Sequence, residues 1–357
     1  MKLKVIISIA IAFAGSLLII SAAKKNAPGP KPTYINLNIP AGWPKPAFNI
    51  FENNRLSEEG FQLGRKLFYD GRLSKDGNFA CAGCHQQFAA FATYDHDLSH
   101  GFGDKFTTRN APGLFNLAWM PLLQWDGGIN HIEVQPLAPL TAHNEMAESI
   151  DSVLIKLRKD KEYIRMFKAA FGDAIINSQR MLKVLAQFTG SIISANSKYD
   201  KVKRGETAFN YGEQKGYEFF KANCNSCHTE PLFTNNSFRN NGFALNSFLK
   251  DEGRKTITGL SSDSLKFKVP SLRNLAYTFP YIHDGRIYSL AQVVDHYQNG
   301  IVQSPTLDTA LAKGIKMDRY EKSYLIAFLY TLTDSSLVKN PRFSDPVAGR
   351  VQGLMQH

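Results

Sequence analysis

Apolar positions recur at helical spacing in several stretches of the chain, and the first of these predicts a helix after a polar start. Ser57 suits an N-cap, and two glutamates follow it in the first turn. The apolar positions of this stretch form one broad face: Leu56, Phe61, Leu63, Leu67 and Phe68. We expect the helix to run to about Tyr69, with Gly64 on its apolar face, where it lets another element approach closely.

The same spacing continues through residues 150–171 and 178–194, and it returns near the C-terminus over residues 319–333. Residues 86–148 are irregular and rich in Gly, Pro, Asn and aromatic residues, so we expect loops that build a site. The polar run 198–205 is the predicted boundary between two units.

The two ends of the chain differ from the rest. Lys2 and Lys4 precede an apolar run with small residues after it, which is typical of a signal peptide or N-terminal anchor over residues 1–23. Either reading predicts export of the body of the protein. Residues 24–50 are rich in proline and are predicted to form an extended arm, and residues 336–357 are predicted to form a loose tail.

The composition is that of a globular protein with a sizeable core, since 43% of the 357 residues are hydrophobic and 20% are charged. At this length we expect two domains or one large one. The net charge of +11 suits an anionic membrane surface or an acidic protein partner such as an electron donor. The chain has no dense run of lysine and arginine, which argues against nucleic acid as a partner.

Two short runs carry the strongest chemical signal: Cys81-Ala82-Gly83-Cys84-His85 and Cys224-Asn225-Ser226-Cys227-His228. In each run two thiols can bind one porphyrin covalently, and the histidine that follows can ligate its iron. A zinc half-site or a redox cysteine pair would explain one such run. Two runs that both end in histidine, and that use all four cysteines of the chain, instead predict two covalently bound haem c groups. Haem c is attached outside the bacterial cytoplasm, which agrees with export to the periplasm.

Each run follows a stretch with helical character, so the layout repeats along the chain. We therefore predict a mainly α-helical fold with two cytochrome c-like domains, each with one covalently bound haem, and active-site loops between them. The predicted domains are residues 51–204 and residues 205–335.

Further motifs extend through these domains: LGRKLFYD at 63–70, RNAP at 109–112, QWDG at 124–127, NEM at 144–146, FKVPSLRN at 267–274 and YIHDG at 281–285. Together with the first cysteine run, and in this order, they resemble bacterial di-haem cytochrome c peroxidases. This superfamily also includes MauG-type enzymes, which oxidise a side chain of another protein.

In that family the N-terminal haem is the peroxide site and the C-terminal haem receives electrons. The resemblance implies that His85 ligates the active iron and His228 the second iron. It implies that Glu145 is a catalytic acid that moves a proton between the two peroxide oxygens, with Gln135 as a hydrogen-bonding neighbour. It also implies that Trp125 relays electrons between the haems.

The resemblance implies a cation site as well. The positions in the family that hold a calcium ion match Asn110, Thr278 and Pro280. A side-chain amide oxygen and two backbone carbonyls are ligands that suit a hard cation. Arg109 and Arg273 are candidates to pair with haem propionates, since a guanidinium offers two parallel donors to a carboxylate. An ion pair at the domain interface is the alternative for each arginine.

Two positions depart from the family pattern. Many members carry a distal histidine that ligates the active iron at rest, but the matching position here is Phe102, with His100 as a nearby substitute. Without that ligand the active iron is expected to be open to peroxide. The usual sixth ligand of the second iron is methionine, but the matching position is Tyr297, as in MauG-type enzymes. His296 competes with Tyr297, although neighbours on a helix point about 100° apart, and Met317 is a remote third choice.

The expected activity is reduction of hydrogen peroxide to water, with electrons from a small cytochrome or copper protein. One alternative is a MauG-like enzyme that oxidises side chains of a partner protein, which Tyr297 and Phe102 favour. A second alternative is a non-enzymatic di-haem electron carrier. The sequence leaves open a membrane anchor at the N-terminus and a homodimer.

Overall fold

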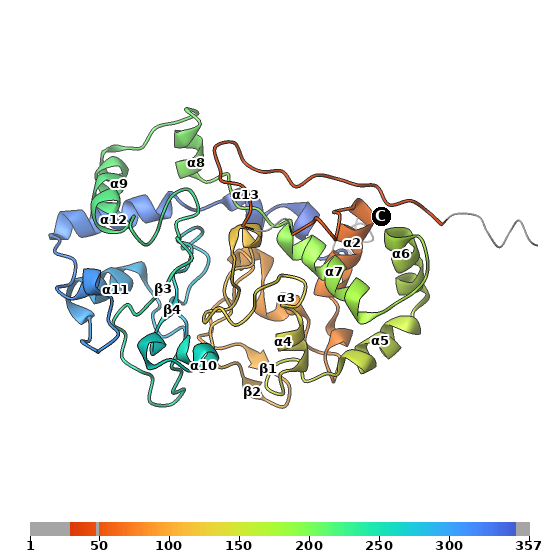
Figure 1. The fold of residues 1–357 in the computed structure, drawn as a ribbon. Helices are drawn as coiled ribbons and strands as arrows, with labels where there is room; N and C mark the ends of the chain where they lie inside the picture. The colour runs from red at the N-terminus through yellow and green to blue at the C-terminus, as the bar shows by residue number, and fades with distance from the viewer. Residues whose placement is uncertain (1–28, 48–49, 348–357) are drawn as a thin grey trace, which may run out of the picture.

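The structure is a computed structural model that describes residues 29–47 and 50–347, and the fold is mainly helical, as predicted (Figure 1). The predicted signal peptide or anchor lies outside the described residues. The N-terminal half contains α2 (Glu58–Phe68), α3 (Cys81–Cys84), α4 (Leu137–Thr141), α5 (Ile150–Arg158), α6 (Lys161–Phe171) and α7 (Ser178–Gly190). The C-terminal half contains α8 (Lys198–Lys203), α9 (Tyr211–Asn223), α10 (Lys255–Thr258), α11 (Leu290–Asp295) and α12 (Arg319–Tyr330), and α13 (Ser335–Val338) follows.

Strands are short and few among these residues. Strand β1 (His100–Gly101) pairs antiparallel with β2 (Lys105–Phe106), and β3 (Phe238–Arg239) pairs antiparallel with β4 (Phe267–Lys268). In the described part of the chain, no helix is both long enough and apolar enough to cross a bilayer.

Helix α2 confirms the local prediction. The Ser57 side chain accepts a hydrogen bond from the backbone N–H of Gly60 at 3.1 Å, and the helix ends at Phe68 with Tyr69 as its C-cap. At Gly64 the helix meets α7 so closely that an added Cβ would lie 1.9 Å from the carbonyl oxygen of Val184. The close approach expected at this glycine is therefore present, and it brings α2 against α7 in the first core.

The C-terminal half uses the same device at the crossing of α9 and α12. An added Cβ at Gly216 would lie 1.9 Å from the carbonyl oxygen of Tyr324. Phe220 of α9 and Phe328 of α12 are fully buried, and their ring centroids lie 5.1 Å apart. These rings form the centre of the second core, directly before the second cysteine run.

Two segments differ from what the sequence predicts: one forms two helices instead of one, and the other forms a helix where a boundary was expected. The stretch 150–171 is two helices, because the Asp160 carboxylate accepts from the backbone N–H of Glu162 at 2.7 Å and so starts α6 anew. The polar run 198–205, expected as a boundary, forms α8, and Asp200 in this helix is buried.

The predicted loose tail is wrong for the residues that the structure describes. After α13 the chain packs against the N-terminal core, where Leu337 and Phe343 are buried. Tyr69 donates to the carbonyl oxygen of Phe343 at 2.7 Å, and the side-chain amide of Gln87 donates to that of Asn340 at 2.8 Å. Residues 337–343 thus connect the C-terminal half to the N-terminal core near α2 (Figure 1).

The described part of the proline-rich arm, residues 29–47, runs along one edge of the N-terminal half toward α8 (Figure 1). Its Trp43 ring lies edge-on to Trp119, with 5.0 Å between ring centroids, and the Trp119 indole N–H donates to the carbonyl oxygen of Pro44 at 2.8 Å. The Arg273 guanidinium carbon lies 4.7 Å from the Trp43 ring centroid. The arm is therefore fixed at the junction of the two halves.

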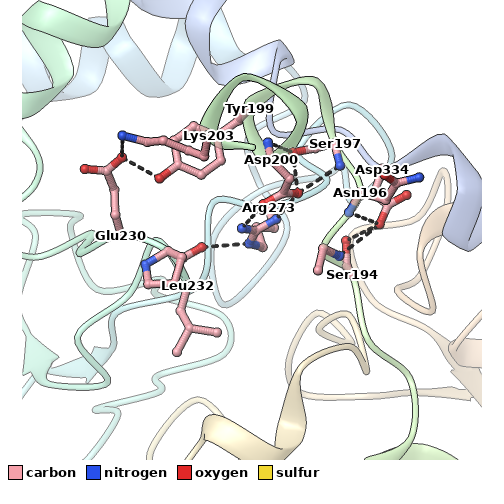
Figure 2. A network of polar contacts seen from close by, with 12 residues as sticks. Ser194, Asn196, Ser197, Tyr199, Asp200, Lys203, Glu230, Leu232, Arg273 and Asp334 are labelled. Carbon is pink, nitrogen blue, oxygen red and sulfur yellow. Dashed lines mark hydrogen bonds and ion pairs between the residues drawn. The ribbon is translucent and has the colours of Figure 1, made fainter. Parts of the chain in front are cut away.

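A buried polar network holds the linker between the halves at the start of α8 (Figure 2). Arg273, whose side chain is 0% exposed, donates to both carboxylate oxygens of Asp200 at 2.8 and 2.9 Å. Its Nε donates to the carbonyl oxygen of Pro231 at 2.8 Å. Nearby, one oxygen of Asp334 accepts from the backbone N–H groups of Ala195 and Asn196 at 3.1 and 3.0 Å. The linker that enters α8 is thus held by two buried carboxylates.

We expect Arg273→Met to lower the free energy of unfolding by about 3–5 kcal/mol, because it leaves the Asp200 carboxylate buried without its counter-charge. Denaturant unfolding of the haem-loaded protein, followed by far-UV circular dichroism, measures this loss. Lys215→Met, which removes a pair with Glu218 that is about half exposed on both sides, is the control, and it should leave the free energy of unfolding nearly unchanged.

The loss should depend on pH. Burial alone would raise the pKa of Asp200, but the hydrogen bonds and charge of Arg273 outweigh it and hold that pKa below its usual value. The stabilisation is therefore present above the usual carboxyl pKa of about 4 and disappears as the pH falls through the lower native value. A difference between wild type and Arg273→Met that stays constant into strong acid would contradict this origin.

Candidate functional site

The first cysteine run forms a single helical turn, α3, with His85 as its C-cap. The His85 ring nitrogen Nδ1 lies 2.9 Å from the carbonyl oxygen of Phe91. A carbonyl only accepts, so Nδ1 carries the proton and Nε2 keeps a free lone pair. Burial lowers the pKa of His85, which favours the neutral ring that a metal requires.

The second cysteine run begins at the C-terminus of α9, where Cys224 is the C-cap. Nδ1 of His228 lies 3.2 Å from the carbonyl oxygens of both Phe233 and Pro270. Burial lowers the pKa of His228 to about 4, so this ring too is neutral and presents Nε2. Both histidines therefore have the backbone-oriented tautomer that is usual for metal-bound imidazole.

The cysteines fit haem attachment as well. All four are free thiols in the structure, and burial raises the pKa of Cys81 and of Cys224 to about 12. Reactive thiolates for redox exchange are thus disfavoured, and each cysteine pair stands directly before an oriented histidine. The residues present at both runs fit this cofactor.

Glu145 lies beside the first run. Its carboxylate is close enough to Cys84 to raise the pKa of that thiol, after the larger effect of burial. Burial also raises the pKa of Glu145 itself. The side-chain oxygen of Gln135 is buried without a hydrogen-bond partner among the described residues. A buried acceptor without a partner destabilises the folded protein, so a ligand that donates a hydrogen bond to this oxygen would be stabilised there.

The β1–β2 hairpin covers Glu145 with its backbone. The N–H of Phe102 donates to the carbonyl oxygen of Glu145 at 2.7 Å, and Gly101 packs against the carbonyl oxygen of Asn144. His100 is exposed, and its ring packs on Phe106 with 4.6 Å between centroids. Successive strand residues face opposite sides, so His100 points away from the face that Gly101 turns toward Asn144.

Trp125 lies where the two halves meet. Its indole N–H donates to the carbonyl oxygen of Asn110 at 2.8 Å. Its own carbonyl oxygen accepts from the backbone N–H of Lys268 in β4 at 2.7 Å. The indole is therefore fixed from the N-terminal half and its backbone from the C-terminal half.

Both candidate propionate-binding arginines are in the alternative role, as ion pairs. Arg109 donates to both oxygens of Asp251 at 2.6 and 2.8 Å and to Asp126 at 2.5 Å, so it joins the two halves. Arg273 is committed to Asp200. Asp251 and Asp200 carried no signal in the sequence, because their arginine partners lie 142 and 73 residues away in the chain. For Asp126 the only signal was its place in the QWDG motif.

The calcium candidates are brought together in part. The Asn110 side-chain amide donates to the carbonyl oxygens of Pro280 at 2.7 Å and Ile282 at 3.3 Å. Thr278 makes a separate backbone contact to Asn274 at 3.1 Å. Calcium at this position stays a prediction.

Tyr297 and His296 stand in the π-helical turn η5 (His296–Gly300) that continues α11. Burial raises the pKa of Tyr297; the Asn241 side chain lowers it in part, and the nearby thiols Cys224 and Cys227 raise it. The phenol thus lies near the second cysteine run. His296 instead places Nε2 2.9 Å from the carbonyl oxygen of Asn241.

Two further contacts distinguish the surroundings of His296 from those of Tyr297. The His296 ring stacks on Phe243 with 3.5 Å between centroids. The side-chain amide of Asn241 lies 3.5 Å from the Tyr297 hydroxyl. Met317 is buried, and its carbonyl oxygen accepts from Gln298 at 2.8 Å. Neither Asn241 nor Phe243 carried a signal in the sequence.

Comparison with known proteins adds to this geometry. Residues 58–208 match the family model described as di-haem cytochrome c peroxidase. The chain is 35% identical over 283 residues to the methylamine utilization protein MauG of Methylorubrum extorquens, covering 78% of this chain and 79% of that protein. It is 32% identical over 300 residues to the cytochrome c551 peroxidase of Nitrosomonas europaea, covering 80% and 82%.

Solved structures agree. A MauG-like protein associated with microbial copper homeostasis is similar with a TM-score of 0.78 and 33% identity, covering 88% of this chain and 99% of that one. The diheme peroxidase BthA from Burkholderia thailandensis shares the fold with a TM-score of 0.69 and 20% identity, covering 89% of this chain and 98% of that one.

We expect the double change Cys81→Ser and Cys84→Ser to remove half of the covalently bound haem, because the second run is untouched. A pyridine haemochrome assay on the purified protein, with the mass of the acid-denatured chain, measures the loss. Ser226→Ala, an exposed position inside the second run, is the control and should keep the full haem content. Unchanged haem content in the double variant would contradict attachment at the first run.

Proposed function

The chain belongs to the di-haem cytochrome c peroxidase family, and from that membership we propose that it reduces hydrogen peroxide to water with electrons from a small redox protein. In this proposal each cysteine run holds one covalent haem c in its own cytochrome c-like domain, with His85 and His228 as iron ligands. The single observation that carries the proposal is the half-buried carboxyl of Glu145, which lies near Cys84 and whose pKa burial raises.

The roles of the chain's own residues follow from their chemistry. Haem bound at the first run supplies the redox chemistry that breaks the O–O bond. Glu145 takes a proton from the inner peroxide oxygen and delivers it to the outer one, so that water leaves, and its raised pKa suits both steps. The unpaired oxygen of Gln135 accepts a hydrogen bond from peroxide and holds it in place. Trp125 passes electrons between the two sites.

We propose Tyr297 as the sixth ligand of the second iron. Its phenol lies near both cysteines of the second run, whereas the competitor His296 is occupied by Asn241 and Phe243. A phenolate is a hard ligand that favours ferric iron, so it lowers the reduction potential of that haem relative to methionine.

The second candidate function keeps the peroxide chemistry and changes the reductant to side chains of a partner protein. It is favoured by Tyr297 together with the 35% identity to a MauG protein. Steady consumption of peroxide with a reduced cytochrome or copper protein supports the first function, and oxidation of a partner without such turnover supports the second.

Three smaller proposals accompany the main one. Asn110, Thr278 and Pro280 bind calcium once the Asn110 amide turns its oxygen inward. The active iron is open to peroxide at rest, since His100 is exposed and Phe102 is not a ligand. The protein is exported to the periplasm.

We expect Glu145→Gln to lower peroxide turnover by about 10²–10⁴-fold, the usual loss when a positioned acid-base group is removed. Stopped-flow consumption of peroxide with a reduced cytochrome measures it. The matched control is Glu148→Gln, three residues on, whose carboxylate pairs with Lys156 at 2.5 Å and should leave turnover unchanged. Equal rates in both variants would sink the assignment of Glu145.

We expect Tyr297→Phe to raise the reduction potential of the second haem and to change its low-temperature EPR signal, because the phenolate is lost. His296→Gln keeps a side-chain donor for the Asn241 carbonyl and should leave both readouts as in wild type. The opposite result, a change in the His296 variant alone, would make His296 the ligand.

A further inference from the structure

Lys268 in β4 reaches from the C-terminal half into the loop that carries Trp125. Its backbone N–H donates to the Trp125 carbonyl oxygen at 2.7 Å. Its Nζ donates to the carbonyl oxygen of Leu122 at 2.8 Å and lies 4.0 Å from the sulfur of Met120. One residue therefore holds this short loop at both ends, from across the interface.

The ammonium of Lys268 has no carboxylate within ion-pair distance among the described residues. Asp126, the acidic group that acts on it electrostatically, already binds Arg109 at 2.5 Å and the backbone N–H of Gly128 at 2.8 Å. Burial lowers the pKa of Lys268 to about 8, and Asp126 offsets part of this effect. A positive charge with only neutral contacts is therefore placed beside the Trp125 loop.

The indole of Trp125 has no base to take its proton. Its N–H donates to the backbone carbonyl of Asn110, which accepts a hydrogen bond but does not bind a proton at ordinary pH. An indole that loses one electron here keeps its proton and becomes a cation. A second positive charge nearby raises the energy of that cation.

We infer that Lys268 is a positioning residue for electron passage through Trp125: it clamps the Trp125 loop from the other half, and its ammonium disfavours a lasting positive charge on the indole. This inference rests on the proposed function, in which peroxide takes two electrons and two protons and becomes water. An electron that leaves the indole for the peroxide site is replaced by one from the second haem site, and no proton moves at Nε1. Trp125 then passes electrons without storing an oxidised state.

The test compares Lys268→Met, which removes the charge and the Leu122 contact, with Lys268→Arg, which restores a cation. Lys266→Met is the matched control, because Lys266 is two residues away and makes a pair with Asp263 at 3.5 Å. Each haem-loaded variant is mixed with one equivalent of peroxide and frozen, and the organic radical is measured by EPR. Adding Trp125→Phe to Lys268→Met identifies the signal.

We expect the radical in Lys268→Met to increase about tenfold over wild type, the change that follows when a charge interaction of about 1.4 kcal/mol is removed. The increase should vanish with Trp125→Phe, and Lys268→Arg and Lys266→Met should match wild type. A radical yield in Lys268→Met equal to that in Lys266→Met would overturn the inference and leave Lys268 a structural residue. An equal increase in Lys268→Arg would overturn the electrostatic part.

A titration of the haem reduction potentials without peroxide separates this inference from the proposed function. Loss of a nearby positive charge shifts these potentials negative in Lys268→Met relative to Lys266→Met. Such a shift in a protein that does not turn over peroxide would defeat the proposed function and still support the electrostatic role of Lys268. Unchanged potentials together with an unchanged radical yield would overturn the inference.

Discussion

The buried ion pair between Arg273 and Asp200 is the constraint on which the anchoring of α8, and of the linker that reaches it from the N-terminal half, depends (Figure 2). Two charges inside a protein are tolerated only when each keeps its partners, since an unpaired buried charge is strongly destabilising. The Arg273 guanidinium also donates to Pro231, in the loop after His228, and lies over the ring of Trp43 in the arm. One side chain thus fixes α8, the loop beyond the second cysteine run and the arm together.

The interface around Trp125 also contains buried charged side chains, but their charges are compensated to different degrees. Arg109 joins Asp126 of the N-terminal half to Asp251 of the C-terminal half, so its charge is fully compensated. Lys268, on the other side of the Trp125 loop, contacts only neutral groups. A relay between two sites needs a fixed distance and a defined local field. In the proposed relay, these contacts supply the first by holding the loop from both halves, and the second through an ammonium whose direct contacts are neutral and which Asp126 offsets only in part.

Local signals were enough to predict helix α2, because the Ser57 cap acts within one turn. The prediction of haem attachment rests on local spacing in the same way, within the two cysteine runs. Long-range partners explain the misses. Phe343 looked like part of a loose tail, since its burial comes from a core built mostly by residues 61–192. Asp200 stood in a polar run, and the arginine that explains its burial lies 73 residues later. The ion pair of Arg273 with Asp200, given only as an alternative to propionate binding, depends on the same long-range contact.

The neighbours His296 and Tyr297 could not be told apart as candidate iron ligands from the sequence alone. Helical geometry predicts that only one of two neighbouring residues can face the iron, but it does not say which. The structure separates them through a single residue of another segment: the Asn241 carbonyl binds His296, while its side-chain amide approaches the Tyr297 hydroxyl. The α-helix also loosens into a π-helical turn here, which changes the direction of each side chain from that of a regular helix. The proposal of Tyr297 over His296 therefore rests on the neighbouring contacts as much as on the residue that the family motif aligns.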